Sequence, residues 1–182
     1  MRLKEAVLGL AHEGDIGATS VAELARRAGI NRSTYYGHAE SPIDLLVQVL
    51  SEELDEIRRH GRERFADAKF SCRQAARESY NELIDHVLRH EAIYCRPSSA
   101  LFALRVVLAE HSEQTMLLVL GEGLLQGPAF GTESRSLYAA FIAHGVVGAI
   151  EAWLALPAPR DRNTLLAVVE AVAGLGAHDN EK

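Results

Sequence analysis

Residues 20–38 read SVAELARRAGINRSTYYGH, and this stretch decides the expected fold. Ser20 is a favourable helix N-cap, and Glu23 three residues later completes a capping box at the start of a short helix. Gly29 ends that helix, because glycine enters a left-handed turn without strain. Asn31 then caps a second short helix. Two short helices separated by a three-residue turn predict a helix-turn-helix.

The rest of the chain also repeats its apolar residues at a helical period, without sustained strand alternation. Ser41 followed by Pro42 is a strong helix start, and the helix that follows is expected to run to about Phe65. The expected helices lie near residues 3–13, 21–28, 31–38, 42–65, 71–90, 98–109, 112–125, 133–156 and 161–175. Their breaks are expected at residues 14–17, 96–97, 110–112, 127–128 and 157–159. We therefore expect an all-α protein of about nine helices.

Composition restricts the class of protein and its location. The 182 residues are 48% apolar and 24% charged, which is typical of a globular chain. The two cysteines lack the spacing of a metal-binding pair. Residues 1–5 lack the apolar centre of a signal peptide, and the most apolar stretch, 137–156, still carries a histidine and a glutamate. We expect a cytoplasmic protein with no membrane partner.

Charge alone does not indicate nucleic-acid binding. The formal net charge is −6, whereas nucleic-acid-binding proteins usually display a basic surface. Residues 1–47 hold five basic and six acidic side chains: Arg2, Lys4, Arg26, Arg27, Arg32, and Glu5, Glu13, Asp15, Glu23, Glu40, Asp44. Any DNA-binding function must therefore depend on where the arginines lie.

The opening stretch resembles the head of the TetR family of transcriptional regulators. The resemblance rests on Ser20, the turn at 28–31 and the Thr-Tyr-Tyr-Gly-His sequence at 34–38, and it covers about the first sixty residues. Residues 141–156 also look like the family's penultimate helix. Two positions depart from the pattern. Ala39 stands where the family usually has phenylalanine, and Pro42 stands where it often has a phosphate-binding lysine.

The resemblance implies a three-helix DNA-binding head, residues 1–46, and a ligand-binding and dimerisation body, residues 47–182. It also implies a homodimeric repressor that a small-molecule effector releases from a palindromic operator in double-stranded DNA, without a cofactor. Two other classes remain open. One is a helical interaction module that has lost DNA binding, which the acidic head and the two departures favour. The other is a helical enzyme, although no nucleophile with a patterned base and no glycine-rich phosphate loop is present.

The resemblance carries DNA-binding roles onto individual residues. Thr34, Tyr36 and His38 match family positions that contact phosphates, a role for hydroxyl and imidazole donors. Arg32 and Ser33, at the start of the second helix, are candidates for reading base edges, since arginine bonds bidentately to guanine. Ser20 is a further phosphate candidate. The alternative is that the arginines form a solvated face; Tyr35 is expected to be buried.

The last two expected helices are apolar on more than one face, which indicates burial on two sides. A partner subunit is the simplest second cover, and the resemblance implies a four-helix interface; inner helices of a monomer are the alternative. The candidate interface residues are Val146, Ile150, Trp153, Leu165, Val169 and Val172.

A ligand cavity in the body is implied by the resemblance. The candidate lining residues are Tyr80, Phe102, Arg105, Met116, Phe141 and His144, each of which is also a plausible core or surface residue. Glu82, His86 and His90 recur every four residues and share a helix face, a spacing that suits a metal ion. We assign no metal there, because no third ligand follows from the pattern.

Overall fold

The computed structural model describes residues 2–123 and 131–173, and within them it contains nine α-helices, one 3-10 helix and no strand. The expected break at 127–128 and the end of the last expected helix, 174–175, lie outside the described residues. Contacts between Cα atoms divide the chain into two compact units: Met1–Glu53 with Val87–Val107, and Leu54–His86 with the described part of Leu108–Lys182. The predicted head, residues 1–46, lies wholly inside the first unit.

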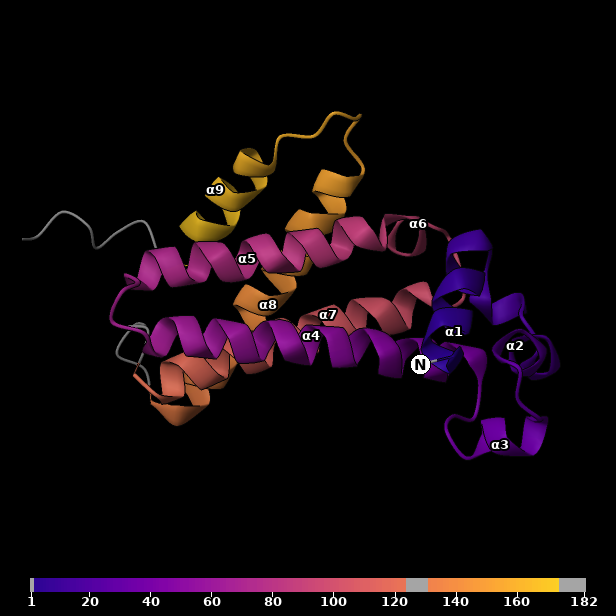
Figure 1. The fold of residues 1–182 in the computed structure, drawn as a ribbon. Coiled ribbons are helices and arrows are strands. Elements are labelled where there is room, and N and C mark those ends of the chain that lie inside the picture. Colours follow the sequence, from indigo (N-terminus) through magenta and orange to yellow (C-terminus); the bar gives the residue numbers. More distant parts are fainter. Residues whose placement is uncertain (1, 124–130, 174–182) are drawn as a thin grey trace, which may run out of the picture. The chain divides into compact units, whose positions relative to one another are not determined.

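The first unit is built around three short helices and the start of a long one (Figure 1). Helix α1 (Arg2–Glu13) packs against α2 (Val21–Ala28), and α2 packs against α3 (Arg32–Tyr36). A short 3-10 helix, η1 (Ile16–Ala18), occupies part of the expected loop because Asp15 accepts a hydrogen bond from the Gly17 N–H at 2.9 Å. The centre of the unit is fully buried and apolar: Val7, Leu24, Tyr35, Leu46 and Leu50.

Helix α4 (Pro42–Ala66) begins where the sequence predicts it. The Ser41 hydroxyl oxygen accepts the Asp44 N–H at 3.1 Å, and the Asp44 carboxylate accepts the Glu40 N–H at 3.0 Å. Pro42 occupies the first helical position, where its missing N–H breaks no helical bond. The helix continues from the first unit into the second, as α5 (Cys72–Arg89) and α7 (Leu101–Gly121) also contribute to both.

Helix α7 corrects the expected break at residues 110–112. The structure has one continuous helix there, because none of these residues removes a backbone donor or requires a left-handed conformation. The Thr115 hydroxyl donates to the His111 carbonyl at 2.7 Å, a bond made inside the helix. A four-residue helix that the sequence did not predict, α6 (Glu91–Tyr94), lies between α5 and α7 and packs against α1.

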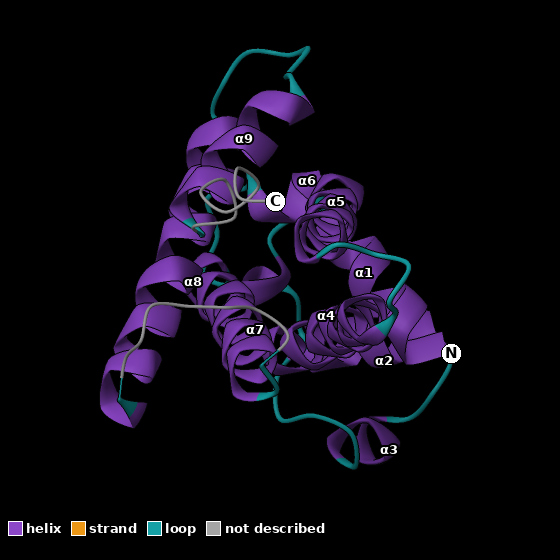
Figure 2. Ribbon diagram, turned by 90° about the vertical axis from the view of Figure 1, so that its left-hand side faces the viewer, coloured by secondary structure: helices purple, strands orange, loops and turns teal. Residues whose placement is uncertain are grey.

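Helices α8 (Thr132–Leu154) and α9 (Arg162–Val172) pack against each other in the second unit (Figure 2). Asp161 caps α9 by accepting the Asn163 N–H at 3.0 Å, and the Trp153 indole N–H donates to the Asp161 carbonyl at 3.0 Å. Helix α8, over Glu133–Leu154, has the length and apolar composition to cross a membrane, as many core helices of soluble proteins do. Its contacts with α9 identify it as a packed helix of this unit.

Candidate DNA-binding helix and body cavity

Helix α3 is fixed at its N-terminus by one side chain. Asn31 has an extended backbone, and its Oδ1 accepts the Thr34 N–H at 2.7 Å. The same oxygen accepts the Ser33 and Thr34 hydroxyls at 2.7 and 2.8 Å. The predicted cap is therefore confirmed, and it satisfies a backbone donor that the short helix leaves without an internal partner.

The turn before α3 has the expected left-handed glycine. Gly29 has φ 67° and ψ 33°, and the following Ile30 N–H donates to the Ala25 carbonyl at 3.0 Å, which closes the end of α2. The capping box at the start of α2 is only half formed. The Ser20 hydroxyl accepts the Glu23 N–H at 3.2 Å, but the Glu23 carboxylate pairs with Arg26 at 2.8 Å, because a charged donor one turn on is the stronger partner.

Helix α3 displays nearly all of its polar side chains to solvent. Arg32, Ser33, Thr34 and His38, on the helix and just after it, are exposed, and Tyr36 is 54% exposed. Ser20, at the start of α2, is exposed as well.

Tyr35 is the exception, with no exposed surface, and it anchors the helix in the core. Burial raises the pKa of Tyr35 to about 12. Ala39 is also buried, so the smaller side chain at this departure from the family pattern sits inside the core.

The arginines of the first unit differ in how they are held. Arg27 forms a two-bond ion pair with Glu13, and Arg26 is held by Glu23. Arg32 makes no hydrogen bond or ion pair with any residue that the structure describes. The Arg32 guanidinium can therefore bind an external group without breaking an ion pair. Arg26 and Arg27 would each have to break one.

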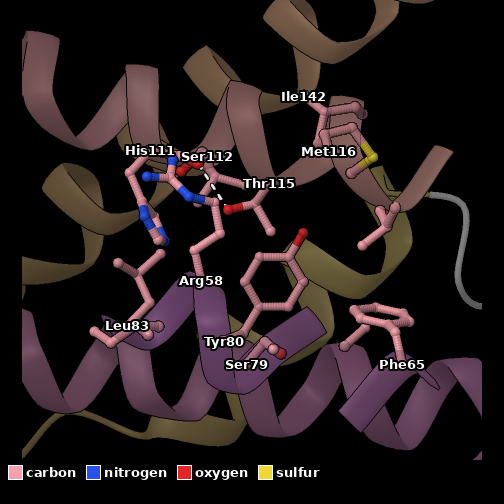
Figure 3. A pocket seen from close by; sticks show the side chains of 15 residues that line it. Arg58, Phe65, Ser79, Tyr80, Leu83, His111, Ser112, Thr115, Met116 and Ile142 are labelled. Atoms are coloured by element: carbon pink, nitrogen blue, oxygen red, sulfur yellow. Dashed lines mark hydrogen bonds between the residues drawn. The ribbon is translucent and has the colours of Figure 1, made fainter. Parts of the chain in front are cut away.

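A cavity lies among α4, α5, α7 and α8 inside the second unit (Figure 3). Its volume, counted as the space open to the centre of a water molecule, is about 50 Å³, and the cavity is partly open to solvent. Most of the lining is hydrocarbon or aromatic: Ile57, Phe65, Ala76, Tyr80, Leu83, Met116, Val119, Ile142 and Val146. Such a concave apolar site with a few polar groups is the usual form of a small-molecule pocket.

The polar groups of the cavity come from α4, α5 and one turn of α7. His111 is 7% exposed, and burial together with the charges of Arg58 and His86 lowers its pKa to about 3. Arg58 donates to the Asp55 carboxylate and to the Gln114 side-chain oxygen. The imidazole is therefore neutral at neutral pH, and the guanidinium already has an anionic partner.

Two of the six predicted ligand residues, Tyr80 and Met116, line the cavity. The other four are exposed on α7 and α8: Phe102, Arg105, Phe141 and His144. An aromatic or polar residue in an otherwise apolar helix is a candidate for a binding site. The sequence pattern does not show which side of that helix faces the cavity. The polar residues His111 and Ser112 were missed because the sequence placed them in a break between helices.

The structure corrects the predicted dimer interface. Five of the six residues are buried within the single chain: Val146, Ile150, Trp153, Leu165 and Val169. Only Val172 is exposed, at 41%. A different set of apolar or small residues is exposed on α8 and α9, which we call the open face: Leu137, Phe141, Gly145, Gly148, Val168 and Val172.

Solved structures share this arrangement of helices. A TetR regulator from Rhodococcus sp. RHA1 aligns over 96% of this chain and 92% of its own at 19% identity, with a TM-score of 0.63. FadR of Thermus thermophilus, a TetR-family repressor solved with lauroyl-CoA, aligns over 96% and 91% at 18% identity, with a TM-score of 0.65. The chain has the TetR fold. The fold that the sequence resemblance implied is thus confirmed, and all-α is the correct class.

A third TetR-fold neighbour is AlkX from Dietzia sp. strain DQ12-45-1b, implicated in biodegradation of n-alkanes; it aligns over 96% and 93% at 17% identity, with a TM-score of 0.64. No protein-family model and no curated protein matches the chain by sequence. Because the identities lie below 20%, the likeness is one of fold. These neighbours are transcriptional regulators, a class distinct from enzymes.

Two of the three residues that recur every four positions, Glu82 on α5 and His90 just after it, have specific partners in this TetR-fold chain. Glu82 forms an ion pair with Arg64, and its carboxylate lies 3.5 Å from the His60 ring. His90 is buried, with Nε2 2.9 Å from the Glu53 carboxylate and Nδ1 3.3 Å from His12. Glu82 is therefore engaged by the Arg64 guanidinium and lies beside the His60 ring.

The Glu53–His90 pair was missed by the sequence reasoning, since its members come from α4 and the segment after α5. Burial favours a raised pKa for Glu53, but hydrogen bonds from His90 and Lys4 outweigh it and hold this pKa at about 2. Burial lowers the pKa of His90. The Glu53 carboxylate of α4 forms an ion pair with Lys4 of α1, which joins these two helices within the first unit.

Proposed function

We propose that this chain is a cytoplasmic, homodimeric transcriptional repressor that binds operator DNA through α3 and is released by a small-molecule effector. The observation that carries the proposal is Arg32: exposed, without a protein partner among the described residues, and at the start of a helix anchored by Tyr35 and capped by Asn31. Arginine in that position suits bidentate bonding to a guanine edge in the major groove. Tyr36 and His38 supply exposed donors for phosphates on either side.

The hydroxyls of Ser33 and Thr34 take a secondary part in this proposal. Both donate to Asn31 in the free protein, so a phosphate contact requires each to exchange one hydrogen bond for another. We therefore expect Arg32, Tyr36 and His38 to contribute more to DNA affinity than these two hydroxyls.

The DNA-binding proposal is tested by selecting DNA fragments with the purified protein and then measuring affinity for the selected site. Replacing Arg32 with alanine should cost about 1–3 kcal/mol and relax the preference at the base pair that it contacts. Arg26→Ala is the matched control, because Arg26 is exposed but already bound to Glu23. Equal effects of the two substitutions would contradict the assignment of base reading to Arg32.

A second copy of the chain is the proposed cover of the open face. Phe141 and Leu137 are 69% and 73% exposed, which is unusual for large apolar side chains of a soluble domain. Gly145 and Gly148 lie exposed on the same helix, and a partner helix can approach closely there because they carry no side chain. A two-fold interface uses the same patch on both subunits, so one apolar face suffices. Two heads in one dimer would read half-sites about 34–36 Å apart.

The dimer proposal is tested by light scattering at micromolar concentration. Phe141→Arg should give monomers that remain helical, since an arginine in the interface would be buried without a partner. Phe102→Arg is the matched control: Phe102 is 77% exposed but lies outside the open face, so this variant should remain a dimer. A dimeric Phe141→Arg variant, or a monomeric wild type, would contradict the proposed interface.

The cavity is the proposed effector site. Two neighbours of the same fold were solved with acyl-CoA ligands, lauroyl-CoA in one and stearoyl-CoA in the other. Helix α4 links this site to DNA binding, because it begins in the first unit and contributes Ile57, Arg58 and Phe65 to the cavity wall. Linkage requires that operator DNA weakens effector binding by the factor by which the effector weakens DNA binding. Equal effector affinities with and without operator would refute this coupling.

An interaction module without DNA binding is the second candidate. Pro42 supports it, because it supplies neither a positive charge nor an N–H where the family often has a lysine. The DNA-selection experiment separates the two candidates. A protein that enriches no fragment, yet still forms dimers through the open face, would be assigned to the second class.

A further inference from the structure

Two polar groups at one end of the cavity have no hydrogen-bond partner. Nδ1 of His111 and the hydroxyl oxygen of Ser112 are both buried and make no hydrogen bond to any described residue. The two residues are neighbours on one turn of α7, and both line the cavity. Buried polar groups without partners are rare in folded proteins, because each one forfeits its bonds to water. A pair of them lining a pocket points to a ligand that supplies the missing bonds.

Two other hydroxyls of the cavity and its arginine already have hydrogen-bond partners. The Thr115 hydroxyl donates to the His111 carbonyl at 2.7 Å, and the Ser79 hydroxyl donates to the Ala75 carbonyl at 2.8 Å. The Arg58 guanidinium donates to Asp55 and Gln114, as described above. The Tyr80 hydroxyl also points into the cavity (Figure 3). Among the described lining residues, the fully buried polar atoms without a partner are therefore those of His111 and Ser112.

The charges around the cavity argue against an ionised ligand group. Among the described lining residues, Arg58 is the one with a permanent charge, and the Asp55 carboxylate already balances it. His111 carries no charge at neutral pH, because burial lowers its pKa. A carboxylate placed beside His111 and Ser112 would lose its water without gaining a counter-charge, which is costly. An uncharged hydroxyl or carbonyl group makes the same hydrogen bonds without that cost.

We propose that the cavity takes an uncharged, largely hydrocarbon ligand whose hydroxyl or carbonyl group bonds to His111 and Ser112. The remaining walls contact the hydrocarbon part through Ile57, Met116 and Ile142 (Figure 3). A neutral imidazole has one donor and one acceptor nitrogen, and a serine hydroxyl both donates and accepts, so the pair serves either kind of group. The inference rests on the proposed function only in taking this cavity as the effector site.

The test compares two eight-carbon probes, 1-octanol and octanoate, by isothermal titration calorimetry on the full chain at about pH 7.5. They share a hydrocarbon chain and differ in the charge of the polar end. We expect 1-octanol to bind at least tenfold more tightly than octanoate. The double substitution His111→Leu with Ser112→Ala should weaken 1-octanol about tenfold, which corresponds to about 1.4 kcal/mol, and should leave octanoate nearly unchanged.

Met116→Ala is the matched control, since it removes hydrocarbon contact and leaves the polar pair intact. It should weaken both probes by the same factor, so that their ratio persists. Octanoate binding as tightly as 1-octanol, 1-octanol binding unaltered by the double substitution, or no binding of 1-octanol would overturn the proposal. The double variant should be as stable as the wild type at neutral pH, because both substitutions remove buried polar groups without partners, so misfolding is separable by circular dichroism.

Failure of this inference is distinguishable from failure of the proposed function. A chain that enriches no DNA but binds 1-octanol through His111 and Ser112 keeps the ligand assignment and loses the repressor assignment. A chain that binds an operator but prefers octanoate does the opposite.

Discussion

The buried imidazole of His111 makes the second unit sensitive to mild acid. Burial, with the charges of Arg58 and His86, lowers the pKa of His111 to about 3, against 6.5 for the ring in an unfolded chain. Between these values the unfolded chain binds a proton that the folded chain does not. The stability contributed by the neutral ring is therefore complete above about pH 6.5 and is lost as the pH falls toward 3.

The size of the effect follows from the separation of the two pKa values. At about pH 5 the pH lies about 1.5 units below the pKa of the ring in the unfolded chain. Each such unit stabilises the protonated unfolded chain by about 1.4 kcal/mol, so the free energy of unfolding falls by about 2 kcal/mol. For a chain of this length that is a fall in Tm of about 4–8 °C. The variant His111→Leu has no ionisable ring at this position, so it does not show this loss on acidification.

The assay is urea unfolding followed by circular dichroism at about pH 7.5 and about pH 5, at one protein concentration, because a dimer's stability depends on concentration. The wild type should lose about 2 kcal/mol more than His111→Leu on acidification. Ser112→Ala is the control: it lines the same cavity without an ionisable group, so it should follow the wild type. Equal acid losses in the wild type and in His111→Leu would refute the claim that burial keeps this ring neutral.

Three further outcomes are expected from the local structure. Asn31→Ala removes the cap of α3, and it should lower DNA affinity for all sequences, with a loss of about 1–2 kcal/mol, while the dimer persists by light scattering. Gly29→Ala forces an alanine into φ 67° and should lower the free energy of unfolding by about 1–2 kcal/mol. Gly14→Ala is the control, because open space surrounds Gly14, and it should change the free energy of unfolding little. Equal effects of the two substitutions would contradict the claim that the left-handed conformation of residue 29 requires glycine. Glu170→Ala removes a buried carboxylate that lies 2.6 Å from the Arg77 guanidinium. It should lower the free energy of unfolding in urea by about 1–2 kcal/mol; the loss is limited because the half-exposed arginine is hydrated again. No loss would show that the ion pair does not contribute to stability.

The helix-turn-helix of the first unit was predicted well because its signals are local. The caps at Ser20, Asn31 and Ser41 bond to N–H groups three residues on, and Gly29 takes the left-handed conformation within its own turn. Interactions over three or four residues depend on sequence spacing alone, so they are visible in the sequence. The incomplete capping box shows the limit of this approach, since Glu23 had a competing partner in Arg26.

The second unit was predicted in class but not in detail, and the errors about which residues of α8 and α9 are buried share one physical cause. Helices α8 and α9 are apolar around most of their circumference. The sequence pattern therefore indicated that both sides of each helix are buried, but not whether this chain or a partner subunit covers each side. Packing within the chain covers the side with Val146 and Leu165, and it leaves Phe141 and Val168 on the open face. Local sequence signals were therefore enough for the all-α class, for most of the helices and for the helix-turn-helix. Only the tertiary structure decided which faces meet, that α7 continues through His111, and that this histidine is buried beside the cavity, because such contacts join residues far apart in the chain.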